Sequence, residues 1–471
     1  MSFIRYQKYG KQEYAYEITA YWDPVKKTCR QKTKYLGVVV DKKKKIFEKR
    51  TPKQIMEKMI LDFGDSYVLE KFLENTKFTS LIKSILGDDA DTLLALLTYR
   101  LCHTGAMMYA NTWYEGNYAK FQYQNAQLKS QRISDFLKTL GDESLQRQFF
   151  QQYLSQFCNT KKGIIIDATS LPNQIHTHLT AWGRSGEEID KQIRFLLVVD
   201  KESGLPVYFR TLPGNIVDVS TVENTMDELN QYGIKDTFVY CDAGFFSEDN
   251  IKIFFEKKVQ FLTRLPAGRT LYKELINAEV NGLESIKNVV KYGERGLFVK
   301  HKEIDLFGNK AHAYIVLDPG RKGRELSRLV ADIAEETPTT ELEYEMLTRG
   351  IMVLVSSSEI SKEDVVPAYY IRQTAEMLFG FSKDDIGILP LRVHSELAIS
   401  GFLFMQFITL IAFAQLKSKL GKEYTVEEIL LTLRNLKCKV YEKEIVVGEL
   451  TKQHKEICEK LEILMSKTLG I

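Results

Sequence analysis

The run that most constrains the fold is Ile164-Ile165-Ile166-Asp167, which follows Gly163. Three consecutive β-branched residues predict a short strand buried on both faces. An acid directly after such a strand is unusual as packing, because an unpaired buried carboxylate costs several kcal/mol. Two roles are therefore open for Asp167: a turn residue that opens a hairpin, or a metal ligand at the end of a central strand.

A second acid, Asp242, ends another short apolar run at residues 237–242. The intervening and following patterns predict strands at 192–200, 206–212 and 260–265 and helices at 220–232 and 248–257, the first with Ser220 or Thr221 as its cap. This order, three antiparallel strands extended by parallel crossovers, is that of an RNase H-like mixed sheet. Its first and fourth strands lie side by side, so Asp167 and Asp242 would meet at one edge.

Residues 266–349 interrupt this α/β pattern. Their glycines and short alternating segments, such as 297–299 and 311–317, predict a mostly β insertion with a polar charged loop at 321–338. The apolar run 350–356 then predicts a return to the core as a strand. A helix over 368–379 is expected to follow, opened by Pro367. The core that carries both acids is thus expected to span 161–416.

The flanking regions differ in charge and periodicity. Residues 1–60 hold sixteen Lys and Arg against six Asp and Glu, and alternating runs at 14–22 and 32–40 around Asp23-Pro24 predict a basic β-rich module. Such a module suits a polyanion partner, although the lysine run 42–45 could also be merely solvated. Residues 61–160 have helical periodicity, clearest at 92–101 and 133–157. A helical segment that follows a basic β module suits DNA end binding. Residues 417–471 are expected to form a helical tail.

Composition excludes several classes. Hydrophobic content of 44% with 27% charged residues is ordinary for a globular chain in several domains. The six cysteines form no Cys-x-x-Cys pair, which argues against a zinc ribbon and a disulfide framework and fits a reducing cytoplasm. No signal peptide is evident. The apolar run 397–416 contains four polar residues, so we expect a buried helix and no membrane contact.

The helix expected at 368–379 carries Tyr369, Arg372 and Glu376, with Lys383 just beyond it. Offsets of three and seven from Tyr369 place Arg372 and Glu376 on one helical face, and Lys383 joins them only if the helix continues past Gly380. A surface ion pair between Arg372 and Glu376 explains part of the same spacing.

The pattern Tyr369-x2-Arg372-x3-Glu376-x6-Lys383 resembles the signature of DDE transposases of bacterial insertion sequences, the YREK-signature group. The segments 166–169 and 242–245 resemble this family's first and second aspartate motifs, and 213–215 with Asp218 resembles a stretch between them. The similarity covers about residues 160–415. One departure concerns base flipping: some relatives stack a flipped base on a Trp in the insertion, where this chain offers only other aromatic residues, namely Tyr272, Phe298, Phe307 and Tyr314.

The resemblance implies metal-dependent cleavage and strand transfer of double-stranded DNA at the element's terminal inverted repeats. The route would be cut and paste, with a DNA hairpin as one of the open cleavage routes. Asp167, Asp242 and Glu376 would be the catalytic acids that hold two Mg²⁺ ions, with Mn²⁺ as a substitute, because hard cations prefer carboxylate oxygens. Tyr369, Arg372 and Lys383 would contact DNA phosphates. Two protomers would pair the ends in a bacterial cytoplasm, at the nucleoid. Two alternatives remain open: a non-catalytic DNA-binding protein derived from a transposase, and an RNase H-like nuclease without strand transfer.

Overall fold

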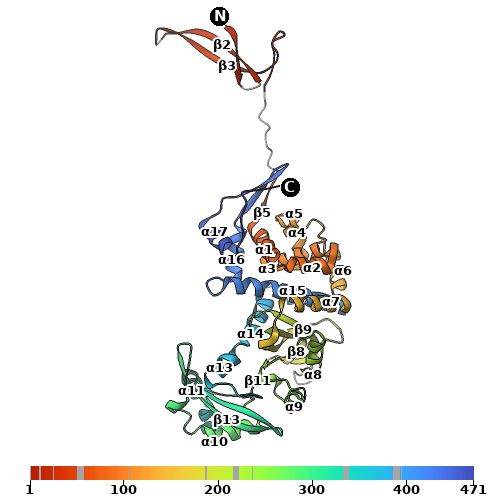
Figure 1. The fold of residues 1–471 in the computed structure, drawn as a ribbon, viewed down its shortest axis with the longest axis vertical. Helices are drawn as coiled ribbons and strands as arrows, with labels where there is room; N and C mark the ends of the chain where they lie inside the picture. Colours follow the sequence, from red (N-terminus) through yellow and green to blue (C-terminus); the bar gives the residue numbers. More distant parts are fainter. Residues whose placement is uncertain are drawn as a thin grey trace. The chain divides into compact units, whose positions relative to one another are not determined.

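The computed structural model describes residues 2–9, 12–24, 26–49, 58–103, 105–185, 188–215, 222–235, 237–331, 339–385, 393 and 395–470 (Figure 1). The chain divides into two compact units. Unit 1 comprises Met1–Ile60, Lys439–Val446 and Thr468–Ile471, and unit 2 comprises Leu61–Cys438 and Val447–Lys467. The predicted site residues all lie in unit 2, so the fold of unit 2 decides whether they meet.

Unit 1 contains an antiparallel sheet in the order β1 (Ser2–Tyr9), β2 (Gln12–Asp23), β3 (Thr28–Asp41) and β4 (Ile46–Glu48). This confirms the β-rich prediction for the basic segment. A bulge lies where Ala15 pairs with Gly37 and Tyr16 with Tyr35. In the lysine run that follows β3, Lys42 Nζ lies 2.6 Å from Glu13 Oε1 and 4.6 Å from the centre of the Tyr6 ring.

The first part of unit 2 is helical, as predicted. After β5 (Met59–Asp62) come α1 (Gly64–Asn75), α2 (Phe78–Leu86), α3 (Ala90–Cys102), α4 (Ala110–Glu115), α5 (Ala119–Gln122), α6 (Ser130–Leu140) and α7 (Glu143–Phe157). The helical periodicity over 133–157 corresponds to two helices, α6 and α7, because the chain breaks at Gly141-Asp142. There the Asp142 carboxylate accepts hydrogen bonds from the backbone N–H groups of Ser144 and Leu145 and caps a new helix.

A buried acid in α1 gives this helical region a pH dependence. The Glu70 side chain is only 6% exposed, and burial, assisted by the neighbouring Glu74, raises its pKa to about 7 while Lys71 opposes the shift. Folding therefore favours the neutral acid. The stability that this provides is fully present below the unfolded pKa near 4.5 and is lost as the pH rises through about 7.

We expect Glu70→Gln, which cannot ionise, to be more stable than the parent chain at about pH 8, by about 1–3 kcal/mol, and nearly equal at about pH 5. Urea unfolding midpoints at both pH values measure the difference. Glu143→Gln, in the same helical region but 79% exposed, is the control that should leave the pH dependence in place. The same pH dependence in Glu70→Gln as in the parent would contradict the assignment.

The centre of unit 2 is a ten-stranded mixed sheet. Its hydrogen-bonded order is β12 (Val289–Tyr292), β13 (Arg295–Leu306), β14 (Asn309–Leu317), β15 (Ile351–Ser356), β11 (Phe261–Arg264), β10 (Val239–Cys241), β6 (Ile164–Pro172), β8 (Glu188–Asp200) and β7 (Ala181–Ser185), with β9 (Pro206–Pro213) also paired to β8. The strand β10 is parallel to both β6 and β11, and β6 is antiparallel to β8. The expected adjacency of the first and fourth core strands is therefore confirmed.

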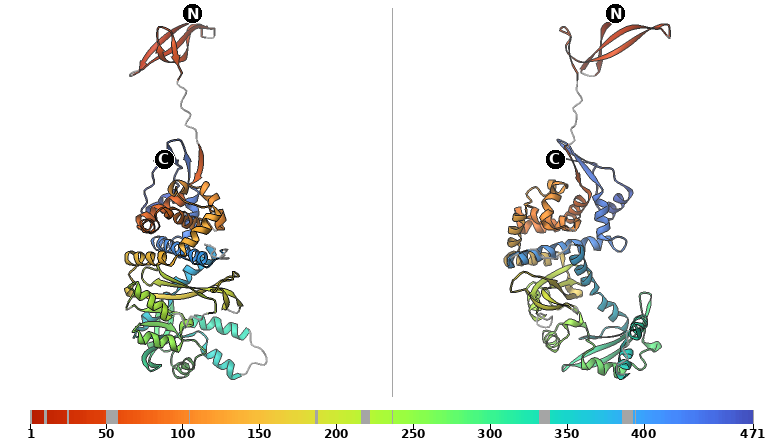
Figure 2. Two further views of the ribbon diagram at one scale, coloured as in Figure 1. Left: turned by 90° about the vertical axis from the view of Figure 1, so that its right-hand side faces the viewer. Right: turned by 180° about the vertical axis from the view of Figure 1, so that it is seen from behind.

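Helices cover this sheet and tie it to the helical region. The crossover helices are α8 (Val222–Gln231) and α9 (Glu248–Glu256), close to their predicted ranges, while the cap expected at Ser220 or Thr221 lies outside the described residues. The long helix α15 (Glu396–Leu420) lies between the sheet and the first helices (Figures 1 and 2). Aromatic rings fill this layer, with Phe407 of α15 5.5 Å from Phe150 and 5.1 Å from Phe209 between centroids.

Among the described residues, α15 alone is long and apolar enough to cross a membrane by length and composition. Inside the structure, 89% of its most apolar window is buried. Of its polar residues, Gln406 and Thr409 are fully buried, and the Thr409 hydroxyl donates to the Met405 carbonyl 2.9 Å away. The prediction of a buried core helix is confirmed.

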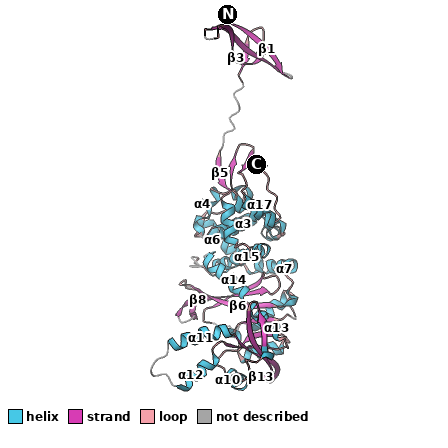
Figure 3. Ribbon diagram, turned by 90° about the vertical axis from the view of Figure 1, so that its left-hand side faces the viewer, coloured by secondary structure: helices cyan, strands magenta, loops and turns pink. Residues whose placement is uncertain are grey.

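The insertion is mixed rather than mostly β. Besides β12, β13 and β14 it contains α10 (Thr270–Glu279), α11 (Pro319–Ala331) and α12 (Thr339–Thr348), which Figure 3 shows together with β13. The loop expected at 321–338 is wrong up to Ala331, and 332–338 lies outside the described residues. A helix begins here because Asp318 accepts a hydrogen bond from the Arg321 N–H and Pro319 occupies the first helical position.

The C-terminal region is not purely helical. After α16 (Val426–Arg434) and α17 (Lys452–Lys460), it also contains β16 (Lys437–Val440), β17 (Glu444–Val447) and β18 (Thr468–Gly470). These three strands form a sheet with β5 in the order β18-β17-β16-β5. Strands this short carry too few residues for a period-two pattern to stand out in the sequence, so the helical tail was predicted in error.

Candidate active site

Asp167 lies within a strand rather than after one. β6 continues to Pro172 through its pairing with β8, so both the strand end at Ile166 and the alternative of a hairpin turn are wrong. Its pairing with β10, however, stops at Ile166, which leaves Asp167 as the first residue beyond that partner. The side chain is 13% exposed, and burial raises the pKa of Asp167 to about 7 against the opposing charge of Arg372.

Asp242 follows the last residue of β10. The parallel register pairs Ile166 with Cys241, so Asp167 and Asp242 are the next residues on two adjacent strands. On the other side, the Thr263 hydroxyl of β11 donates to the Asp242 carbonyl 3.1 Å away and fixes the backbone there. The predicted meeting of the two acids at one sheet edge is confirmed by this register.

The segment with the helical site residues consists of two helices, not of one helix opened by Pro367. Helix α13 (Lys362–Tyr370) begins after its cap Ser361 and contains Pro367, and α14 (Gln373–Gly380) follows. Arg372 lies at the junction between them, and Glu376 lies in the first turn of α14. A proline within a helix removes a backbone donor and interrupts the regular hydrogen bonding. Helix α14 packs on β6 and β8, and Figure 3 shows it beside these strands.

The guanidinium of Arg372 lies among three carboxylates. Its Nη1 is 3.8 Å from Asp167 Oδ2 and 3.5 Å from Asp242 Oδ2, and its Nη2 is 2.8 Å from Glu376 Oε1. The Tyr369 hydroxyl donates to Asp242 Oδ1 at 3.0 Å, and the Arg372 guanidinium lies 5.4 Å from the centre of the Tyr369 ring. Three acids from three separate segments thus converge on one cation.

This part of the chain can be compared with known families. A profile of the family described as "Transposase DDE domain" matches residues 159–412, more than half of the chain and the whole of the region that carries the three acids. The chain belongs to the transposase DDE domain family. A solved structure described as "Cryo-EM structure of piggyBac transposase synaptic complex with hairpin DNA" is similar with a TM-score of 0.43 and 11% identity over 79% of each chain. No curated protein matches the chain significantly.

Within this DDE domain the acids have the chemistry of a hard-cation site. Carboxylate oxygens are the ligands that Mg²⁺ and Mn²⁺ prefer, and three carboxylates around one positive charge need a cation to offset their repulsion. In the described residues, no group of three or more His, Cys, Asp or Glu side chains is close enough to hold a metal ion in this conformation. The guanidinium of Arg372 lies among the carboxylates instead. The chemical types of the three side chains therefore suit a divalent cation. In this conformation, however, the carboxylates are arranged around the guanidinium of Arg372.

The structure also places several other predicted residues of the DDE domain. Lys383 is half-buried in η7 (Phe381–Asp385), a π-helical turn that follows α14, so the helical path does continue past Gly380. Gly214 lies against β8, where a Cβ atom would come within 2.1 Å of the Gln192 carbonyl oxygen, so the Pro213-Gly214-Asn215 stretch needs glycine for packing. Asp218 lies outside the described residues. Tyr272 and Tyr314, two of the four aromatic candidates for base stacking, are buried.

Arg264 was missed by the sequence reasoning. It is the last residue of β11 and half-buried, and its charge opposes the rise in the pKa of Tyr369 that burial and Asp242 cause. The signal was present in the sequence, because β11 was predicted as the next parallel strand after β10 and its last residue lies at the same sheet edge. Arg264 is thus a second basic residue near the carboxylates.

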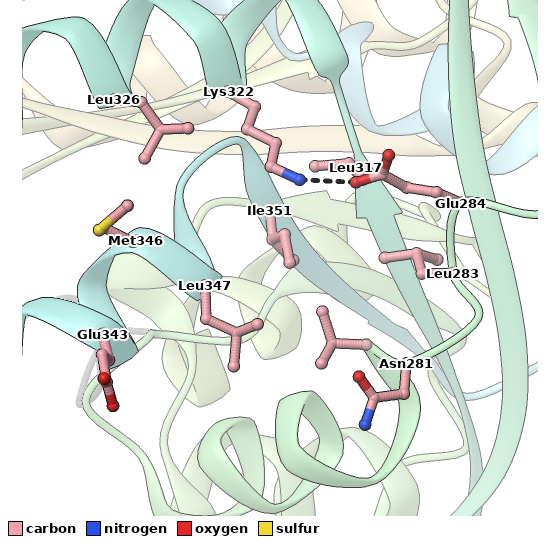
Figure 4. Close-up of a pocket in the computed structure, with 11 residues that line it drawn as sticks. Asn281, Leu283, Glu284, Leu317, Lys322, Leu326, Glu343, Met346, Leu347 and Ile351 are labelled. Atoms are coloured by element: carbon pink, nitrogen blue, oxygen red, sulfur yellow. Dashed lines mark hydrogen bonds and ion pairs between the residues drawn. The ribbon is translucent and has the colours of Figure 1, made fainter. Parts of the chain in front are cut away.

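A cavity of about 430 Å³ lies elsewhere in the insertion (Figure 4). Leu326, Met346, Leu347 and Ile351 give it apolar walls, and an ion pair of 2.6 Å joins Lys322 to Glu284 at its side. None of its lining residues belongs to the carboxylate cluster. The cavity is therefore separate from the candidate active site.

Proposed function

We propose that this chain is a DDE transposase that cuts and rejoins DNA at the ends of its own mobile element. The observation that carries the proposal is the convergence of Asp167, Asp242 and Glu376 on one cation inside the region that matches the DDE family. The order of strands β9-β8-β6-β10-β11 supports an RNase H-like core, and the YREK spacing supports the insertion-sequence group of bacteria.

The chemistry consists of two phosphoryl transfers. Cleavage adds water across a P–O3′ bond and leaves a 3′-hydroxyl, and joining uses that hydroxyl to displace a 3′-oxygen of target DNA. Asp167, Asp242 and Glu376 would hold two Mg²⁺ or Mn²⁺ ions, which supply an activated nucleophile and neutralise the leaving oxygen. Both reactions then use the same site, so one set of acids can perform both steps of cut and paste.

The chain's own residues position these groups. β6 and β10 are adjacent sheet strands, so the two aspartates are held on a rigid support. The Tyr369 hydroxyl fixes the rotamer of Asp242 through its hydrogen bond. A planar guanidinium can hold two phosphate oxygens at once, and an ammonium acts as a point charge, so Arg372 and Lys383 suit the scissile phosphate and its neighbours.

Two other functions remain distinguishable. A non-catalytic DNA-binding protein derived from a transposase needs no acidic cluster, and the three converging carboxylates favour an enzyme over it. An RNase H-like nuclease would use the same acids and would stop after cleavage. Incubation of the purified chain with labelled element ends and Mg²⁺ tests for cleavage, and inverted repeats with short direct repeats beside the gene would identify those ends.

The N-terminal regions are proposed to bind the element's DNA, with two protomers pairing the ends. In unit 1, Arg30, Lys32 and Lys34 are exposed at alternate positions of β3 and therefore project from one face of the sheet. Phosphate neutralisation by such residues releases counterions and makes binding salt-dependent. The excess of positive charge in residues 1–60 is therefore suited to binding the phosphates of a DNA backbone.

We expect the triple change Arg30→Gln, Lys32→Gln and Lys34→Gln in the full chain to weaken binding to terminal-repeat DNA. The slope of log affinity against log salt concentration should become less negative by up to about 2.7, which is about 0.9 for each lost phosphate contact. Fluorescence anisotropy at several salt concentrations measures both quantities. The matched control removes three exposed lysines of the C-terminal region, Lys443, Lys452 and Lys455. An equal loss in both variants would contradict a specific role for β3.

A further inference from the structure

Arg372 neutralises the acids that the proposed cation would also neutralise. One guanidinium contacts Asp167, Asp242 and Glu376 at 3.8, 3.5 and 2.8 Å. Its side chain is 19% exposed and that of Asp167 is 13% exposed, so the contact between these two lies mostly out of water, where charge attraction is stronger. The side chains of Asp242 and Glu376 are 37% and 48% exposed. The arrangement differs from a surface ion pair, because a single positive charge serves three acids from three segments.

The guanidinium is held by charge more than by directed hydrogen bonds. Only the contact with Glu376 has the length of a charge-assisted hydrogen bond, while those with Asp167 and Asp242 are longer than such bonds. The Nε–H of Arg372 is buried without a hydrogen-bond partner among the described residues. A buried donor without a partner costs free energy. Arg372 can therefore move to a position in which more of its N–H groups are hydrogen-bonded.

Tyr369 supports the arginine side chain without depending on it. Its ring lies 5.4 Å from the guanidinium, and its hydroxyl is anchored to Asp242 Oδ1. A stacked guanidinium can turn or slide over such a ring and keep the cation–π contact. Arg372 can thus leave the carboxylates and still stay beside the active site.

We propose that Arg372 is a built-in counter-ion that a divalent cation displaces from Asp167 and Asp242, and that the released guanidinium then binds a DNA phosphate. The inference rests on the proposed function and adds a coupling between its two ligands. Without a cation, the Arg372 guanidinium contacts the acids and does not bind a DNA phosphate. With a cation, the acids are neutralised and the guanidinium is available. By thermodynamic reciprocity, DNA must then tighten cation binding by the same factor.

The first test needs no substitution. Phenylglyoxal, which modifies accessible arginines, is applied to the full chain with and without Mn²⁺, and modified peptides are quantified by mass spectrometry. We expect Mn²⁺ to increase the modification of Arg372 several-fold. Arg349, which forms a comparable ion pair of 2.6 Å with Glu345 away from the site, should not respond. Unchanged or reduced modification of Arg372 would overturn the inference.

The second test compares cation affinities. We expect Arg372→Gln to bind Mn²⁺ about tenfold more tightly than the parent in calorimetry without DNA, because the competing charge is gone. In the parent, Mn²⁺ should tighten binding of a DNA duplex more than it does in Arg372→Gln. Equal Mn²⁺ affinity in both chains would refute the displacement and leave the proposed function intact. Failure of both chains to bind Mn²⁺ would refute the proposed metal site as well.

Discussion

Asp167→Asn is expected to lose DNA cleavage by on the order of a thousandfold or more, while the chain stays folded and still binds DNA. The amide keeps the shape of the side chain and removes the negative charge. Asp167 is mostly buried beside Arg372, and opposite charges attract more strongly away from water. A bound cation should therefore lose much of its binding free energy when this charge is removed. Asp242→Asn and Glu376→Gln should have effects of similar size. Single-turnover cleavage of labelled element ends measures the loss.

Asp190→Asn is the matched control for this experiment. Asp190 lies in β8, on the strand next to β6, and its carboxylate accepts the Lys191 N–H at 2.7 Å, away from the cluster around Arg372. Its substitution should leave cleavage within a few-fold of the parent. Loss of folding in Asp167→Asn, shown by circular dichroism, would instead assign a structural role to Asp167 and contradict its catalytic assignment.

Arg372→Lys is expected to lower cleavage or strand transfer by about a hundredfold with the unfolding midpoint almost unchanged. Lysine keeps the positive charge among the acids and loses the planar fork that holds two phosphate oxygens. If Arg372 only orients Glu376 as an ion pair, an interaction of this kind is worth under about 1 kcal/mol and activity should be nearly full. Cleavage rates and thermal midpoints on one preparation separate these two roles.

Arg349→Lys provides the corresponding control, because Arg349 pairs with Glu345 at the same helical spacing of four. Both its activity and its midpoint should match the parent. A nearly active Arg372→Lys enzyme would contradict the phosphate contact and leave Arg372 with its contacts to the three carboxylates.

The strands that carry two of the acids were predictable because their signal is local. The isoleucine run before Asp167 and the apolar run before Asp242 each define a buried strand, and the order of elements between them makes the two strands neighbours. The spacing of Tyr369, Arg372 and Glu376 was also sufficient to place all three together, even across the junction of two helices. These local patterns can be read from the sequence because the side chains that form the elements also determine where the site residues lie.

The rest depended on pairing between distant segments. β6 continues past Asp167 only because β8 supplies partners up to Gln192. The insertion extends the central sheet because β14 pairs with β15, which no pattern within residues 266–349 reveals. The position of Arg372 among all three acids likewise depends on tertiary contacts, since its spacing from Glu376 is the only part written in the local sequence.

The domain boundaries expected at residues 160 and 416 and the identities of the phosphate-binding residues remain predictions. Unit 1 combines residues 1–60 with two C-terminal segments, a discontinuous arrangement that composition alone does not indicate. Tyr369 illustrates the difficulty with single residues. Its hydroxyl donates to Asp242, so in this structure it supports an acid, and a contact with DNA remains to be measured.

The most direct test of the central claim is a strand-transfer assay. The purified chain is incubated with a labelled, pre-cleaved element end and an unlabelled supercoiled plasmid, with Mg²⁺, with Mn²⁺ or with a chelator. We predict labelled plasmid product in the presence of either cation, and its loss with the chelator and in Asp242→Asn. Cleavage of an intact end without any joined product would identify a nuclease, and DNA binding without cleavage or joining would contradict the assignment of the three acids as a catalytic site.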